Sequence, residues 1–261
     1  MPNTPYSNNK YLEMQAYVGI TKHNGGLEAT NELLSLCRIE AAREVLNVGC
    51  GVGATSTYIV RRYACRVVGV DISEQMIAWS RKRAREAHVE ARLEFHTADV
   101  LDLPFEDGRF DLVFAESVLG FVEDKSRAIR ECVRVTRPGG YVGINETFWL
   151  KELSPEMAEG VRRAVGMSIP ALATWQSLWE ASGLDEAVVK TYPIEARREV
   201  RGRIRLLGAR WVLAGFGRLL RLYFQEAASR PFLKEIFNAS MDTMESMGYG
   251  LFVGQKAGGR T

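Results

Sequence analysis

The sequence VLNVGCGVGATS, residues 45–56, decides the fold class of this chain of 261 residues. Its apolar start at 45–48 predicts a strand, and the glycines that follow predict a turn. The next stretch, 54–63, predicts a helix. Glycine has no Cβ, so a glycine turn between a strand and a helix lets the polar part of a ligand lie against the backbone. The stretch therefore predicts a ligand site on an α/β domain.

The glycine turn fits more than one class of ligand. Gly49, Gly51 and Ala54 satisfy the dinucleotide pattern G-x-G-x-x-G/A, which is typical of nicotinamide-dependent oxidoreductases. A lone glycine turn does not separate these enzymes from proteins that bind other nucleotide cofactors. The rest of the chain must decide between them.

Strands and helices alternate over the hundred or so residues around this turn. The predicted strands after the first lie at 65–71, 91–99, 110–117 and from 137 onward, and the predicted helices lie at 27–42, 74–88 and 124–135. Such alternation predicts an α/β fold, a doubly wound, mostly parallel sheet with a Rossmann-like architecture. The carboxyl ends of parallel strands share one edge, so the ligand is expected along that edge.

The second half of the chain predicts an insertion. A helix at 174–184 and a strand at 186–194 precede a long, mainly helical stretch, and a last strand follows at 249–256. We therefore expect a seven-stranded sheet with a helical cap inserted before the last strand. The predicted parts are a helical segment covering the ligand site at 1–43, a core at 44–195 and 248–257, and the cap at 196–247.

Composition narrows the class of protein. Hydrophobic residues make up 46% and charged residues 25%, which is ordinary for a globular protein with its own core. The four cysteines form no C-x-x-C pair, so neither a zinc site nor a disulfide framework is expected, and a cytoplasmic location fits best. The polar start lacks an apolar signal core, and no apolar run approaches membrane-spanning length. Neither export nor stable membrane insertion is expected.

Charge is concentrated in one segment. The net charge is only +2, but residues 195–221 hold eight arginines against two glutamates, a local charge of 8 − 2 = +6. A localised patch of this kind indicates a localised partner or a solvated face. The chain has no broad basic surface and no added recognition motif, so nucleic acid is not an expected partner.

Four blocks in order carry a family resemblance. They are VLNVGCGVGATS, VVGVDIS, ADVLDLPFEDGRFDLVFAESVLGFVED and RPGGYVGINE, spread between Val45 and Glu146. Together they resemble the class I S-adenosylmethionine-dependent methyltransferases, closest in style to the ubiquinone and menaquinone C-methyltransferase-like group of small-molecule enzymes. The resemblance favours S-adenosylmethionine over a nicotinamide cofactor, with S-adenosylhomocysteine as its product.

The resemblance implies roles for individual residues. Gly49 and Gly51 would let the backbone approach the methionyl part, Asp71 would accept from the ribose hydroxyls, and Asp99 would accept from the adenine amine. At Asn47 many relatives have an acid near the cofactor's ammonium group, and here an amide oxygen can accept instead. The full predicted cofactor set is Asn47, Gly49, Cys50, Gly51, Asp71, Ile72, Met76, Asp99, Val100, Glu116 and Tyr17.

Methyl transfer from a sulfonium needs alignment and desolvation, and it needs a base only if the acceptor must lose a proton. Glu146 at the end of the predicted fifth strand and His23 in TKHNGG are the candidate catalytic residues. For each, a purely structural role is the alternative. No metal is expected.

The predicted acceptor is a small hydrophobic or aromatic molecule. Aromatic and aliphatic residues of the cap are expected to form the roof of its pocket, and a homodimer through the cap is the competing use for them. The arginines leave three interpretations open: a solvated face, an arginine for an acidic group of the acceptor, and an interfacial helix at a membrane. A non-catalytic cofactor-binding or membrane-surface protein is the alternative function, and a nicotinamide-dependent oxidoreductase is a further one.

Overall fold

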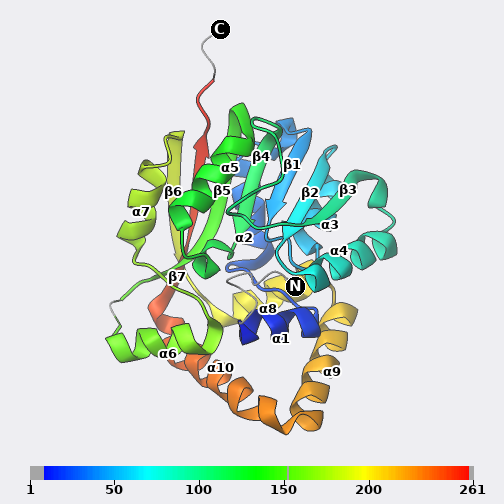
Figure 1. Cartoon of the computed structure of the whole chain (residues 1–261), viewed down its shortest axis with the longest axis vertical. Helices are drawn as coiled ribbons and strands as arrows, with labels where there is room; N and C mark the ends of the chain where they lie inside the picture. The colour runs from blue at the N-terminus through cyan, green and yellow to red at the C-terminus, as the bar shows by residue number, and fades with distance from the viewer. Residues whose placement is uncertain (1–8, 152, 259–261) are drawn as a thin grey trace.

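A computed structural model describes residues 9–151 and 153–258 (Figure 1). Its centre is one seven-stranded sheet with the strand order β3-β2-β1-β4-β5-β7-β6. The strands are β1 Glu44–Val48, β2 Arg66–Asp71, β3 Leu93–Thr97, β4 Phe110–Glu116, β5 Thr136–Trp149, β6 Asp185–Pro193 and β7 Met247–Gln255.

The sheet is mixed, so the expectation of a doubly wound, mostly parallel sheet is met only in part. Strands β1 to β5 pair in parallel with one another, but β7 pairs antiparallel with both β5 and β6. The reason is where the chain lies before β7. The helices after β6 lie beyond the edge at which β4 and β5 end (Figure 1), so β7 starts from that edge and runs back.

Helices cover both faces of the sheet. Alternate residues of β4 enter the two separate cores: Val113 packs with α5 and α7, and Phe114 packs with α2 and α3. This two-residue period is the one expected of a strand that is buried on both faces. The covering helices are α2 Gly26–Leu36, α3 Ala54–Arg62, α4 Glu74–Ala87, α5 Lys125–Val135 and α7 Leu172–Glu180.

The remaining helices gather beyond the carboxyl edge of the parallel strands (Figure 1). They are α1 Lys10–Val18, α6 Pro155–Val165, α8 Ala196–Leu207, α9 Ala209–Gln225 and α10 Arg230–Thr243. Helix α10 packs on α6, α9 packs on α1, and α8 packs on α2. The chain between β6 and β7 therefore extends over the edge where a ligand is expected.

Two glycines let α8 approach α2 closely. A Cβ added to Gly202 would lie 2.9 Å from the Cα of Gly26, and a Cβ on Gly26 would lie 2.8 Å from the Cα of Gly202. Backbone therefore meets backbone at this crossing, and any side chain would force the helices apart. This close approach brings the inner face of α8 to the edge of the sheet.

Helix α9 has a sharply divided surface. Its inward side includes Gly215 and Trp211, and Trp211 donates from Nε1 to the carbonyl of Gly19 at 2.6 Å. Its outward side exposes large apolar side chains, namely Leu213, Phe216, Leu220 and Phe224. Within the described part of the chain, no helix combines the length and hydropathy needed to cross a bilayer.

Candidate functional site

The glycine turn after β1 is shaped by segments that close over it. Gly49 and Gly51 have φ values of +64° and +54°, in a backbone region that residues with a Cβ rarely adopt. A Cβ on Gly49 would collide with Val118, and a Cβ on Gly51 would collide with Thr21. The loop after β4 and the segment between α1 and α2 therefore lie directly against this turn.

A cavity of about 400 Å³ opens beside the turn. It is lined by the ends of β1, β2, β3 and β4, by the segment between α1 and α2, and by α8. The predicted cofactor residues that line it are Asn47, Gly49, Cys50, Gly51, Asp71, Ile72, Met76, Asp99, Val100 and Glu116. The structure thus brings together residues from four separate strand ends.

Asp71 is held in place by the turn itself. Its Oδ2 accepts from the amide of Gly51 at 2.9 Å, and its Oδ1 accepts from the amide of Ser73 at 3.0 Å. Burial raises the pKa of Asp71, and the two backbone hydrogen bonds counteract part of that rise. Each carboxylate oxygen has a further lone pair, so Asp71 can still accept from the hydroxyls of a ribose in the cavity.

Asn47 is oriented by a neighbouring hydroxyl. Its Nδ2 donates to Ser56 Oγ at 2.9 Å, and its side chain is buried at the cavity wall. This bond uses the amide nitrogen, so the amide oxygen is available as the acceptor for a ligand's ammonium group. The arrangement fits the role that the family resemblance implies for this position.

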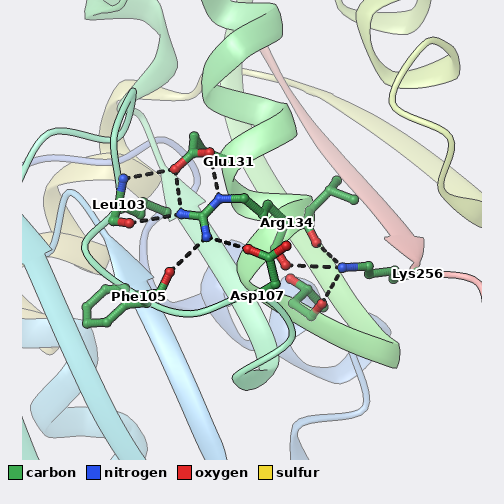
Figure 2. A network of polar contacts seen from close by, with 8 residues as sticks. Leu103, Phe105, Asp107, Glu131, Arg134 and Lys256 are labelled. Atoms are coloured by element: carbon green, nitrogen blue, oxygen red, sulfur yellow. Dashed lines mark hydrogen bonds and ion pairs between the residues drawn. The ribbon is translucent and has the colours of Figure 1, made fainter.

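The loop after β3, which carries Asp99 and Val100, is fixed by a network centred on Arg134 of α5 (Figure 2). The Arg134 guanidinium donates to the carbonyls of Leu103 and Phe105 at 2.9 and 2.8 Å. It also pairs with Glu131, whose Oε2 accepts from the Leu103 amide at 2.9 Å. Asp99 itself caps the loop, because its Oδ1 accepts from the Leu101 amide at 2.9 Å. The network therefore holds the loop just beyond Asp99 and Val100, the residues that would face an adenine.

Glu146 is not at the cavity, which corrects the expectation that it acts directly on the acceptor. Its side chain is 0% exposed and does not line the cavity. Its carboxylate accepts from the amides of Val118, Leu119 and Gly120 at 2.9, 2.7 and 3.3 Å. Burial raises its pKa to about 7, although these three hydrogen bonds act in the opposite direction. Glu146 therefore holds the backbone of the loop after β4 in place through these three hydrogen bonds.

His23 lies at the cavity within a polar cluster. Its Nε2 is 3.0 Å from Thr30 Oγ1 and 3.8 Å from Glu116 Oε1. The Thr30 hydroxyl donates to the same Glu116 oxygen at 2.7 Å, and the Thr55 hydroxyl donates to the other at 3.1 Å. The structure thus brings the candidate His23 into the same cluster as the predicted cofactor residue Glu116.

Tyr17 is on the outside of α1, which corrects its place in the predicted cofactor set. It is 44% exposed and does not line the cavity, whereas its neighbours Ala16 and Val18 are buried. The tyrosine that does line the cavity is Tyr11, whose ring stacks on Phe121 with centroids 6.2 Å apart. Tyr11 lies six residues earlier on α1, where the helix faces inward.

The cap contributes to the cavity through α8 and not through its aromatic side chains. Glu199, Val200, Arg203 and Leu206 of α8 line the cavity, and Thr243 lines it from α10. The expected aromatic and aliphatic residues are absent from the lining: Trp211, Phe216, Leu219, Leu220, Tyr223, Phe224, Phe232 and Phe237. The expectation that they form the roof is corrected accordingly.

Sequence reasoning missed the other half of the cavity. An apolar wall comes from the loop after β4, from α6 and from the residues that follow α6: Val118, Phe121, Val122, Val161, Val165, Met167 and Ile169. Helix α6 was not predicted as part of the site, because nothing in its sequence marks it except amphipathic spacing. Lys22 at the cavity was also not singled out, and Arg203 was considered only as one of several arginines on a helix face.

Among the described side chains, no group of three or more His, Cys, Asp or Glu residues is placed to hold a metal ion. The polar groups at the strand ends are instead acceptors for hydroxyl, amine and ammonium donors. Together with the glycine turn and the antiparallel β7, this donor set resembles the cofactor site of the class I S-adenosylmethionine-dependent methyltransferases. S-adenosylmethionine carries the ribose, the adenine and the ammonium group that these residues would hold.

Comparisons with known proteins agree with that class. Residues 46–144 match the family described as "Methyltransferase domain". The matched residues include the glycine turn and the strand ends that line the cavity. The match favours S-adenosylmethionine over a nicotinamide cofactor at the glycine turn.

Individual proteins resemble the chain over different lengths. "Methyltransferase GfsG" of Streptomyces halstedii is 30% identical over 164 residues, which cover 61% of this chain and 59% of that protein. The chain spans less than two thirds of the length of the first curated relatives that it matches.

Two solved structures share the fold over almost the whole chain. A methyltransferase from Geobacter sulfurreducens in complex with S-adenosyl-L-homocysteine is 19% identical, with a TM-score of 0.71 over 93% of this chain and 96% of that one. The [4+2]-cyclase SpnF is 21% identical, with a TM-score of 0.73 over 95% of this chain and 93% of that one.

Proposed function

We propose that this chain transfers the methyl group of S-adenosylmethionine to a small acceptor with a largely apolar body. The observation that carries the proposal is the composition of the cavity: cofactor-binding residues at the ends of β1, β2 and β3 face an apolar wall from the loop after β4 and from α6. When bound, S-adenosylmethionine supplies an activated methyl group on a sulfonium. The residues of this chain would align the acceptor with it and exclude water.

The apolar wall supports a hydrophobic or aromatic acceptor. Phe121 and Met167 present flat and adaptable apolar surfaces, and Val161 and Val165 present one face of α6. A wall of this kind desolvates the acceptor without specifying a polar pattern. The atom that receives the methyl group would lie between this wall and the end of β4.

We further propose His23 as the general base for an acceptor that must lose a proton. Because the Thr30 hydroxyl donates to Glu116, its oxygen is the acceptor for a proton on His23 Nε2. That tautomer leaves Nδ1 unprotonated and able to take a proton. Glu116 would then act as a positioning residue for His23 while it also borders the cofactor. Glu146 would support the loop and would not contact the acceptor.

The proposed test follows the methyl group itself. The purified chain is incubated with S-adenosylmethionine labelled in the methyl group and with fractionated small-molecule extracts, and label transferred to an extractable product is measured. Transfer supports the proposal. Formation of an unlabelled product that still requires the cofactor would contradict it. This outcome is worth testing because SpnF, which shares this fold, is a [4+2]-cyclase. Mass spectrometry of ligands that co-purify with the chain would identify the acceptor class independently.

Several wider assignments remain proposals. We propose that residues 196–247 form a cap and that 1–43 form the segment that covers the cofactor. The proposed likeness to the ubiquinone and menaquinone C-methyltransferase-like group rests on the four sequence blocks. The four cysteines are free and buried, which supports a cytoplasmic location. The outward apolar side chains of α9 support either a homodimer through the cap or a membrane-surface role.

A further inference from the structure

Two cations face the cavity from different elements. Lys22 comes from the segment between α1 and α2, and Arg203 comes from α8. Lys22 is open to the cavity although protein atoms surround it on the other sides. Burial lowers the pKa of Lys22, the charge of Arg203 lowers it further, and the charge of Glu199 raises it. The two side chains are therefore close enough for their charges to interact.

Neither cation is neutralised within the described part of the chain. No ion pair and no side-chain hydrogen bond joins Lys22 or Arg203 to another described residue. Other arginines of the segment are paired: Arg198 and Arg205 bind Glu28 on the outside of the molecule.

The acid whose charge acts on Lys22 already accepts a backbone hydrogen bond. Glu199, one turn before Arg203 on α8, accepts from the Gly25 amide at 2.5 Å. Of the four carboxylates that line the cavity, only Glu199 is among the charges that act on Lys22. Two cations without an ion-pair partner among the described residues, at the wall of one cavity, favour a ligand that brings negative charge.

The position of Arg203 links it to the apolar wall. Burial raises the pKa of Tyr11, and the positive charge of Arg203 lowers it, so the two side chains lie near each other. The Tyr11 ring in turn stacks on Phe121 of the apolar wall. Lys22, in contrast, follows Thr21, which lies against Gly51 of the cofactor turn. The cations therefore stand between the two halves of the cavity, and the carboxylate of the cofactor itself is the competing occupant.

We propose that Lys22 and Arg203 bind a carboxylate or phosphate of the methyl acceptor, which is thus an organic acid with an apolar body. Arginine presents a planar fork that matches both groups, and lysine adds a point charge. The inference rests on the proposed methyl transfer, because it assigns the acceptor to the apolar half of the same cavity.

The test uses the full chain saturated with S-adenosylhomocysteine and two matched probes, cinnamate and its neutral amide, with inorganic phosphate as a third. Calorimetry measures their affinities for the wild type, Lys22→Met, Arg203→Leu and Arg203→Lys. Arg201→Leu is the control, because Arg201 is exposed on the same helix and does not line the cavity. Thermal unfolding of each variant checks that it is folded.

We expect cinnamate or phosphate to bind the wild type, with cinnamate preferred over its amide by about tenfold or more. Lys22→Met and Arg203→Leu should each remove about tenfold of that affinity, Arg203→Lys should restore part of it, and Arg201→Leu should change nothing. Equal affinities for the acid and the amide together with no phosphate binding, or equal losses in the Arg201 control, would overturn the proposal.

A second arm separates the acceptor from the cofactor. S-adenosylhomocysteine carries a carboxylate and 5′-methylthioadenosine does not. If Lys22→Met and Arg203→Leu weaken the first about tenfold, leave the second unchanged and do not alter cinnamate binding, the cations serve the cofactor and the proposal is wrong. If the wild type binds no S-adenosylhomocysteine at all, the methyltransferase function fails and not the acid site.

Discussion

Replacing Glu146 by glutamine should change the way stability depends on pH. The carboxylate is completely buried and accepts three backbone hydrogen bonds from Val118, Leu119 and Gly120. Its pKa rises from an ordinary 4.5 to about 7 because burial penalises the charged form. Glutamine keeps the shape and removes the charge, although its amide nitrogen cannot accept from one of the three N–H groups.

The sign of the effect follows from the direction of the pKa change. A carboxyl whose pKa is higher in the folded than in the unfolded chain stabilises the fold most below the unfolded value. That contribution is lost as the pH rises through the folded value near 7. With these two pKa values, the free energy of unfolding of the wild type should fall by about 2 kcal/mol between pH 5.5 and 8.5 through Glu146 alone.

Urea unfolding of both proteins without cofactor, at pH 5.5, 7 and 8.5, measures this difference directly. At pH 5.5 the wild type should be more stable than Glu146→Gln, because all three amides keep an acceptor. At pH 8.5 that advantage should have shrunk by about 2 kcal/mol. The control is Glu123→Gln, since Glu123 is exposed near the same loop and should give a gap that does not change with pH. A constant gap for Glu146→Gln as well would refute the reasoning.

Three further substitutions test other parts of the site. Asp71→Asn should weaken S-adenosylhomocysteine by about tenfold or more, because one oxygen that accepts from a backbone amide or from the ribose becomes a donor; calorimetry that shows unchanged affinity would contradict its role. His23→Gln should lower kcat by about a hundredfold and leave cofactor affinity intact, and a wild-type kcat would exclude it as the base. Gly202→Ala should lower the free energy of unfolding by about 1–3 kcal/mol, because the new methyl meets the backbone of α2. Gly217→Ala is its control, since a Cβ there meets nothing within 4 Å and should be neutral or stabilising.

The cofactor half of the site could be predicted because its signals are local. A strand, a glycine turn and an acid at the end of the next strand are each predicted from a few consecutive residues. Parallel strands then bring the turn and the acid to one edge of the sheet. Asp71 and Asp99 both line the cavity for this reason. The parallel pairing of β1 to β5 likewise follows from the alternation of strands and helices in the sequence.

The burial of Glu146 could not be predicted from local sequence patterns. The sequence placed it at the end of the fifth strand, but β5 continues to Trp149 and pairs with β7 on its other side, with Glu146 opposite Gly250. A residue in the middle of a central strand is buried, and here it faces the loop after β4. That outcome depends on a strand about a hundred residues later in the chain, which no local pattern reveals.

The orientation of the arginines in the cap could not be predicted from helical spacing alone. A continuous helical wheel over 203–222 puts Arg203, Arg210 and Arg221 on one face, but the chain breaks at Gly208, where φ is +86°, and α8 and α9 are separate helices. Arg203 therefore faces the cavity, while Arg210 and Arg221 are exposed on α9.

The inner face of α9 serves α1 and not the acceptor. Trp211 and Arg218 donate to the carbonyls of Gly19 and Val18, which lie at the carboxyl end of α1 and have no partner within that helix. This contact holds the segment that carries Lys22 and His23 over the cavity. Changes to acceptor specificity are therefore expected from α6 and α8, which line the cavity, whereas changes to the inner face of α9 should loosen the N-terminal segment and weaken the whole site together.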